Sequence, residues 1–179
     1  MRVIGGEFRS RAIKSLPGLD VRPTPDRLRE ALFNILAPLI EGTVFADLYA
    51  GTGAVGIEAL SRGAARAIFV EQKHAAAKAI RENLRSLGID GRAEVRQGRA
   101  TAAISRLEAD IVFLDPPYAL ENEYTAALDL LGEKPPPLVI AQHPPRLKLA
   151  DRYGALHRTR LVKHGDNALS FYGQVANAV

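Results

Sequence analysis

The chain has 179 residues, a net charge of +4 at neutral pH and no cysteine. That length supports one domain with a substantial apolar core, and two domains would be cramped. The lack of cysteine excludes disulfides, thiolate nucleophiles and cysteine-based zinc sites.

Residues 1–20 form a basic segment ahead of the main apolar pattern. Gly5 and Gly6 predict the turn of a β-hairpin, because glycine accepts the backbone conformations of tight turns. We expect this hairpin to be an extension that reaches outward from a domain spanning residues 21–179. A solvated surface is the usual role of a basic cluster, but the positive net charge favours contact with nucleic acid. The basic residues of the hairpin are Arg2, Arg9, Arg11 and Lys14.

A helix is predicted to begin at Thr24 and Pro25. Thr24 suits the N-cap position, where its hydroxyl accepts a backbone N–H, and Pro25 suits the first helical position because it has no N–H to leave unpaired. Arg22 and Arg27 flank this start and extend the basic surface. The spacing of apolar residues predicts one buried stripe on the helix, formed by Leu28, Leu32, Ile35 and Leu39.

A glycine-rich loop follows the first buried strand, which we place at residues 43–48. Gly51 and Gly53 let the backbone turn tightly and approach a ligand, and Gly56 permits close contact between a helix and a strand. The helix is expected at residues 54–62. The pattern of strand, glycine loop and helix is typical of nucleotide-binding folds.

A second strand, at residues 67–70, leads into Glu71 about twenty residues after Gly51. A carboxylate at this position is suited to bind both hydroxyls of a ribose. Together with the glycine loop, Glu71 predicts a nucleoside pocket. The motif alone does not distinguish a nicotinamide dinucleotide from S-adenosylmethionine.

The rest of the chain alternates between helix and strand. Glycine at position 88 is expected to end the first of these helices, whose buried face is formed by Ala76, Ile80, Leu84 and Leu87. This order predicts an α/β fold with a mostly parallel sheet, helices on both faces and an antiparallel hairpin at one edge. The predicted elements are helix 73–87, strand 93–96, helix 100–107, strand 110–114, helix 121–131, strand 138–141, and a hairpin of strands 156–163 and 168–175.

The strand that ends at Leu114 runs directly into Asp115-Pro116-Pro117-Tyr118. The two prolines have no N–H, so the turn offers a carboxylate and carbonyl acceptors with few competing donors. Asp115 and the Pro116 carbonyl are suited to hold an exocyclic amine by both hydrogens, and Tyr118 offers a flat face for a base. Asp and Pro are also ordinary turn residues, so the position beside the glycine loop decides the interpretation.

Two carboxylates favour a methyl donor over a dinucleotide. Asp47 lies four residues before Gly51, and Asp115 is expected at the same edge of the sheet, because both stand at the carboxyl ends of parallel strands. The sulfonium of S-adenosylmethionine is cationic and would be attracted by these side chains, whereas a pyrophosphate would be repelled.

The chain resembles 16S ribosomal RNA guanine-N2 methyltransferases of the RsmD type, which belong to the class I methyltransferases with a Rossmann-like sheet. The resemblance covers nearly the whole chain. The stretch that points most specifically to this subfamily is the Arg-Pro-Thr segment. It rests on residues 22–34 (RPTPDRLREALFN), 47–64 (DLYAGTGAVGIEALSRGA), 69–71 (FVE), 115–118 (DPPY) and 165–172 (GDNALSFY).

The resemblance implies S-adenosylmethionine as cofactor and methylation of one guanine of 16S RNA, guanine 966 in the usual numbering, within a partly or fully assembled 30S particle. The catalytic residues implied are Asp115, Pro116 and Tyr118. The residues implied in cofactor binding are Asp47, Tyr49, Gly51, Gly53, Glu71, Gln72, Gly98, Arg99 and Asp115. Those expected to contact RNA are Arg2, Arg9, Arg11, Lys14, Arg22, Arg27 and Tyr118.

Two positions depart from the pattern of similar enzymes. An acid usually follows the third strand and meets the adenine amine, but Arg99 stands there and cannot accept that hydrogen bond. Gln97 or a backbone carbonyl would have to replace it. Strand 138–141 is followed by Gln142, where a glutamate is expected.

Three other interpretations share some of these features. A DNA adenine or cytosine methyltransferase would use the same turn, a nicotinamide-dependent oxidoreductase would share the glycine loop, and a non-catalytic RNA-binding or ribosome-assembly factor would bind without turnover. The four histidines lack the spacing of metal ligands, so no metal is expected. No signal peptide or membrane span is apparent, so we expect a cytoplasmic protein, acting as a monomer.

Overall fold

The computed structural model describes residues 1–18 and 23–175. Within these residues eight strands form one sheet, in the order β3-β2-β1-β4-β5-β8-β7-β6. The strands are β1 (Val44–Leu48), β2 (Arg66–Glu71), β3 (Ala93–Gln97), β4 (Ile111–Leu114), β5 (Leu138–His143), β6 (Arg152–Tyr153), β7 (Leu156–His164) and β8 (Asn167–Gln174). The helices are α1 (Asp26–Leu36), α2 (Ala54–Ser61), α3 (His74–Leu87), α4 (Ala100–Ala103) and α5 (Glu121–Glu133), with single 3-10 turns at Asp90–Arg92 and Ile104–Arg106.

The sheet has the predicted topology. Strands β1 to β5 are parallel to their neighbours, and β8, β7 and β6 continue the sheet in antiparallel order beyond β5. The chain builds outward from β1 through β2 to β3 and then returns to place β4 on the other side of β1. The strand order therefore reverses between β1 and β4, and in open α/β sheets ligands bind in the crevice beyond the carboxyl ends of such strands.

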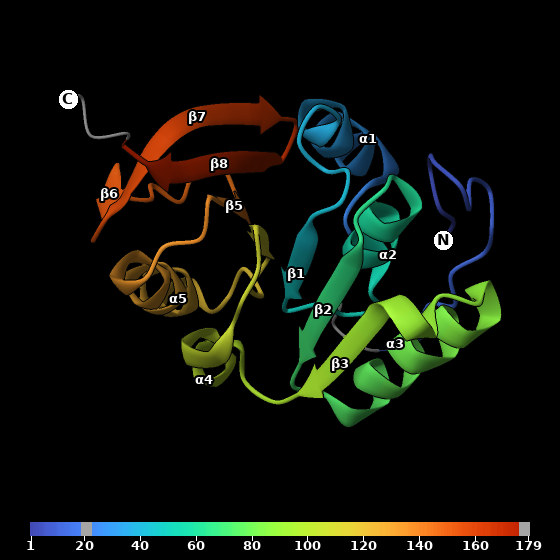
Figure 1. Cartoon of the computed structure of the whole chain (residues 1–179). Helices are drawn as coiled ribbons and strands as arrows, with labels where there is room; N and C mark the ends of the chain where they lie inside the picture. Colours follow the sequence, from blue (N-terminus) through green and yellow to red (C-terminus); the bar gives the residue numbers. More distant parts are fainter. Residues whose placement is uncertain (19–22, 176–179) are drawn as a thin grey trace.

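Helices cover both faces of the sheet, as expected for a Rossmann-like fold (Figure 1). Side chains from α1, α2 and α3 pack on one face, and side chains from α4 and α5 pack on the other. Since successive residues of a strand point to opposite faces, Phe45, Phe69 and Phe113 lie on the first face. None of the helices in the described part of the chain is long and apolar enough to cross a membrane.

Glycines set the contacts and ends of α2 and α3 as predicted. A Cβ added to Gly56 would lie 2.3 Å from the ring of Phe69, so only glycine lets α2 pack this closely on β2. Gly88 has a φ of 70° and ends α3. The predicted buried face of α3, which includes Ile80 and Leu84, is confirmed.

The N-terminal segment is a hairpin that packs against the core, so the expectation that it reaches outward is wrong. One antiparallel bridge joins Arg2 and Ala12, and the apolar side chains Val3 and Ile13 are buried against α2 and α3. The carboxylate of Glu58 accepts the backbone N–H groups of residues 4 and 5, at 2.9 and 2.8 Å. The segment was interpreted from its basic residues, and its buried apolar side chains were therefore not predicted.

Helix α1 begins one residue later than predicted. Pro25 is the N-cap, with an extended ψ of 144°, so Thr24 does not cap the helix. The helix ends at Leu36, and Leu39 lies beyond it with 56% of its surface exposed, which makes its place in the predicted stripe wrong. The buried face of α1 is formed by Leu28, Arg29, Leu32, Phe33 and Leu36.

Two short elements differ from prediction. Residues 100–107 form one turn of α-helix followed by a 3-10 turn rather than one continuous helix. Strand β6 has two residues and was not predicted, because a pairing this short leaves no periodic pattern in the sequence.

Candidate functional site

A cavity of about 760 Å³ lies at the carboxyl ends of the parallel strands. Its volume falls within the range of roughly 300–1,000 Å³ that is common for ligand sites. The ends of β1 and β2 and the loops that follow them contribute Asp47, Tyr49, Gly51, Glu71 and Gln72. The loops after β3 and β4 contribute Gly98, Arg99, Asp115, Pro116 and Tyr118. Most of the predicted site residues therefore line one cavity.

Gly53 is the exception among the predicted cofactor residues. It is not part of the cavity lining, but its φ of 82° forms the left-handed turn that begins α2. A Cβ at this position would lie 3.3 Å from Ile80 and Phe69. Gly53 thus shapes the loop, while Gly51 faces the cavity.

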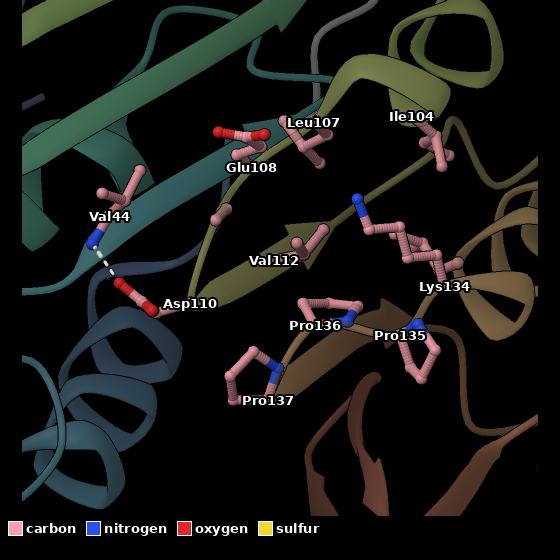
Figure 2. Close-up of a pocket in the computed structure, with 12 residues that line it drawn as sticks. Val44, Ile104, Leu107, Glu108, Asp110, Val112, Lys134, Pro135, Pro136 and Pro137 are labelled. Carbon is pink, nitrogen blue, oxygen red and sulfur yellow. Dashed lines mark hydrogen bonds between the residues drawn. The ribbon is translucent and has the colours of Figure 1, made fainter.

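A smaller cavity of about 380 Å³ lies at the opposite edge of the sheet, at the amino ends of β1, β4 and β5 (Figure 2). The Val44 N–H donates to Asp110 at 2.8 Å there, and Pro135, Pro136 and Pro137 form one wall. It contains none of the predicted site residues, so the chemistry is assigned to the larger cavity.

Three carboxyl groups, Asp47, Glu71 and Asp115, gather in the larger cavity and are called here the carboxylate cluster. Each follows a buried phenylalanine by two positions, so all three point toward the face covered by α1 to α3. Burial raises the pKa of Asp47 well above its ordinary value; the N–H of Gly56 opposes this and the charges of Asp115 and Glu71 add to it. A bound cation would relieve this repulsion.

Glu71 is held in position by the backbone of the loops beside it. Its two carboxylate oxygens accept the N–H of Gly51 at 2.8 Å and the N–H of Lys73 at 2.7 Å. Each carboxylate oxygen has more than one lone pair, so further acceptor capacity remains for ribose hydroxyls. The geometry suits the predicted role of Glu71.

Sequence reasoning missed Glu123, which reaches the cavity from the first turn of α5. Its carboxylate accepts the hydroxyl of Tyr49 at 2.8 Å and a guanidinium N–H of Arg99 at 3.1 Å. Burial, together with Glu123, raises the pKa of Tyr49 and keeps it a donor. Glu123 thus supplies an acid beside Arg99 at the place where an acid after the third strand was expected. An acid in the first turn of a helix is common, so nothing in the sequence distinguishes Glu123 for this role.

Gln97, the proposed substitute for that acid, lies outside the cavity lining. Its side chain is exposed and contacts the ring of His74 at 3.2 Å. It therefore takes no part in the site as the structure has it.

Two residues that were not predicted support the Asp115–Tyr118 turn. The hydroxyl of Tyr124 lies 2.9 Å from the carbonyl of Gln142 and 3.3 Å from the carbonyl of Pro116, so it joins the ends of β4 and β5. The hydroxyl of Tyr118 donates to the side-chain oxygen of Asn167 at 2.7 Å, which ties the turn to the start of β8. Asn167 is 49 residues from Tyr118 in sequence, whereas Tyr124 lies only eight residues beyond Pro116.

Gln142 lines the same cavity at the end of β5 and is only 2% exposed. Its side-chain oxygen Oε1 is buried and has no hydrogen-bond partner within residues 1–18 and 23–175. A buried acceptor without a donor is costly in a protein interior. Oε1 is therefore poised to accept a donor from a ligand.

The basic residues predicted to bind RNA are exposed where the structure describes them, whereas Tyr118, predicted to bind RNA as well, is half-buried. Arg11 donates to the carbonyl of Ser86 at 3.1 Å and Lys14 pairs with Glu82 at 2.8 Å, so both are tied to α3. Arg2, Arg9 and Arg27 are exposed as well, and Arg22 lies outside the described residues. Among the residues that the structure does describe, no group of three or more His, Asp or Glu could hold a metal ion.

Several known proteins similar to this chain are named as methyltransferases. The family model described as Conserved hypothetical protein 95 matches residues 1–173. "Putative rRNA methyltransferase YlbH" of Bacillus subtilis is 35% identical over 181 residues, covering 96% of this chain and 98% of its own length. "Ribosomal RNA small subunit methyltransferase D" of Escherichia coli is 41% identical over 120 residues, covering 66% of this chain and 60% of its own length. The solved structure "Putative methyltransferase yhhF from Escherichia coli" matches with a TM-score of 0.83 and 33% identity over 99% of each chain.

Proposed function

The chain belongs to the family described as Conserved hypothetical protein 95, the RsmD-type methyltransferases that use S-adenosylmethionine, and from this premise we propose that it methylates the N2 amine of a guanine in 16S ribosomal RNA. The observation that carries the proposal is that the glycine loop after β1 and the Asp115–Tyr118 turn after β4 line one cavity. One loop suits the cofactor and the other suits an amine.

The carboxylate cluster and the glycine loop fit S-adenosylmethionine. Glu71 would bind the ribose hydroxyls, Gly51 would lie beside the amino-acid part, and Asp47 would face positive charge. Glu123 and Arg99 border the same space. When bound, the cofactor supplies a methyl group whose bond to sulfur breaks as the bond to N2 forms.

Asp115 and the Pro116 carbonyl would hold the two hydrogens of the amine. This orients the nitrogen lone pair and places acceptors where positive charge develops, which is the usual way in which preorganised groups lower a barrier. After transfer, one proton leaves the nitrogen for Asp115 or water. Tyr118, fixed by Asn167, would stack on the flipped base, an interaction worth roughly 1–3 kcal/mol.

The names of the relatives support ribosomal RNA as the substrate class. The finer proposal is guanine 966, presented by a 30S subunit or its assembly intermediate in the cytoplasm, with the chain acting as a monomer and without a metal. The exposed basic residues beside the cavity, among them Arg2 and Arg27, would contact phosphates. The proposed domain arrangement keeps residues 1–20 as an extension of the domain at 21–179.

The direct test measures transfer of labelled methyl from S-adenosylmethionine to unmethylated 30S subunits, free 16S RNA and DNA, with nucleoside analysis of the products. We expect N2-methylguanosine in RNA. N6-methyladenine or N4-methylcytosine in DNA would indicate a DNA methyltransferase instead. Cofactor binding with no transfer to any of the three would contradict the proposal and favour the non-catalytic binding factor.

Replacing Asp115 by Ala tests the assigned mechanism. We expect kcat to fall by at least about 100-fold, which is typical for loss of one group that stabilises charge in a transition state. The dissociation constant for S-adenosylmethionine, measured by calorimetry, should stay within a few-fold of wild type. A variant that binds no cofactor would contradict the role of Asp115 in holding the amine.

A further inference from the structure

Gln142 lies next to Asp115 at the end of the neighbouring strand. Leu114 of β4 pairs with Ala141 of β5, so Asp115 and Gln142 each come one residue later on adjacent parallel strands. Phe113 and Ile140 are buried on the face covered by α1. Asp115 follows Phe113 by two positions, and Gln142 follows Ile140 by two positions. Because side chains alternate along a strand, both point to this face and into the cavity.

The carbonyl oxygen of the Gln142 amide is the group that lacks a partner. Oε1 is buried without a donor among the described residues, although the side chain lines a cavity large enough for a nucleoside. The backbone carbonyl of Gln142 lies 2.9 Å from the hydroxyl of Tyr124, which also approaches Pro116. The side chain is thus carried by backbone that is joined to the amine-binding turn.

The bases with exocyclic amines differ at the ring nitrogen beside the amine. In guanine the amine lies between two ring nitrogens: N1 carries a hydrogen and is a donor, and N3 has a lone pair. In adenine N1, and in cytosine N3, the corresponding nitrogen has a lone pair and is an acceptor. An acceptor placed beside the groups that hold the amine therefore suits guanine, and would face a second acceptor in the other two bases.

We propose that Oε1 of Gln142 accepts the N1–H of the target guanine and makes the site selective for guanine. The inference rests on the proposed function and names the residue that reads the base. Pairing with N1–H satisfies the buried acceptor only when the correct base is present. A base with a lone pair there would leave both acceptors unpaired and desolvated.

An amide also suits this position electrostatically. The carboxylate cluster already places three acids in the cavity, and their mutual repulsion contributes to the raised pKa of Asp47. Glu123 lines the cavity as well, so the glutamate expected after this strand would be a fifth acid there. Glutamine provides an acceptor of the same geometry without the additional charge.

The test compares guanine with 2,6-diaminopurine at the target nucleotide of otherwise identical RNA. The analogue keeps the 2-amino group but has a lone pair at N1 and an amine in place of O6. The effect of N1 is therefore taken from the difference between wild type and the Gln142 variant. Wild type should prefer guanine in kcat/KM by about 10- to 100-fold, the discrimination expected from a base-edge hydrogen bond. Gln142→Met, which has similar length and no amide, should methylate guanine about 10- to 100-fold more slowly and prefer it by no more than about threefold.

Two further variants control this experiment. Gln142→Glu retains an acceptor and should keep a preference for guanine. Gln174→Met makes the same chemical change at an exposed position of β8 outside the cavity lining and should behave as wild type. All variants should bind S-adenosylmethionine as wild type does, which reports that the cofactor side of the cavity is intact.

The outcomes separate this inference from the proposed function. If wild type forms N2-methylguanosine but Gln142→Met keeps the full preference for guanine, Gln142 does not read N1 and only this inference is overturned. If wild type forms no N2-methylguanosine, the proposed function fails and the inference fails with it.

Discussion

Asp47 combines burial with proximity to two other carboxyl groups. It is 2% exposed, and its pKa in the folded protein is raised well above the ordinary value, mainly by burial. Because the folded-state pKa is the higher one, ionising Asp47 costs stability above about pH 4, and the cost grows until the pH passes the folded-state pKa. The side chain therefore weakens the fold at neutral pH, a cost that is common where function needs a charge.

Replacing Asp47 by Asn should remove this cost, because the amide oxygen can still accept the N–H of Gly56. We expect the free energy of unfolding at pH 7 to be no lower than that of wild type, because the amide has no charge to desolvate. Urea unfolding between pH 4 and pH 8 should show a smaller loss of stability with rising pH in the variant. A variant clearly less stable than wild type at pH 7 would contradict this account of Asp47.

The same variant should bind S-adenosylmethionine about tenfold more weakly, since it loses a negative charge facing a cation. Calorimetric titration at pH 7 measures the difference. Unchanged affinity would mean that Asp47 has no electrostatic role toward the cofactor.

For single residues, the sequence predicts a role in the site when the residue belongs to a local motif. Gly51, Glu71 and Asp115 were recognisable because each lies at or just beyond the end of a predicted strand, and Glu71 follows Gly51 at the spacing typical of nucleotide-binding folds. Glu123 and Asn167 were not recognisable, because their partners Tyr49 and Tyr118 are 74 and 49 residues away. Only the folded topology shows which of many similar polar residues meets the motif.

Among the elements, the N-terminal hairpin is attached to the domain through α2. The carboxylate of Glu58 is fully buried and accepts N–H groups of residues 4 and 5 as well as Arg62 at 2.8 Å. Arg29, also buried, donates to the carbonyl of Arg2 at 3.0 Å. The hairpin that carries the basic residues is thereby fixed beside the cavity, which Met1 helps to line.

Replacing Glu58 by Gln should destabilise the protein by about 2–3 kcal/mol. Gln presents an NH2 group to backbone donors, so one N–H of the hairpin is left buried without an acceptor. Urea unfolding measures the loss, and limited proteolysis should show faster cleavage within residues 1–18. Glu133→Gln, on the exposed surface of α5, is the matched control and should change stability by less than about 0.5 kcal/mol. Equal stability of both variants would contradict the role of Glu58.

The elements of the sheet were largely predictable, and the attachment of the hairpin was not. Strand β4 is a continuous apolar run, and β1, β2 and β5 are apolar except at or near their ends, which is typical of buried parallel strands. Glu58 lies in a helix whose residues are all buried, and periodicity carries no information about which charged residue a helix will bury. The same holds for Arg29, which interrupts the apolar face of α1.

On the scale of the whole molecule, the two halves of the sheet contribute different parts of the site. The β1–β2 half carries the glycine loop and Glu71, and the β4–β5–β8 half carries Asp115, Gln142 and Asn167. The halves meet where the strand order reverses. A ligand in the cavity contacts both, so its binding should stabilise the folded chain as a unit.

Thermal unfolding in the presence of S-adenosylhomocysteine tests this coupling. At a concentration about 100-fold above its dissociation constant, a ligand that binds only the folded state adds about 2.7 kcal/mol, which for a chain of this size raises Tm by about 5–10 °C. Glu71→Ala should have a lower Tm without ligand, because the N–H groups of Gly51 and Lys73 lose their acceptor. Its increase in Tm at the same ligand concentration should be at most half that of wild type, since the ribose contact is lost. An equal increase in both proteins would mean that the cofactor binds without Glu71 and that the carboxylate serves only to hold the loop.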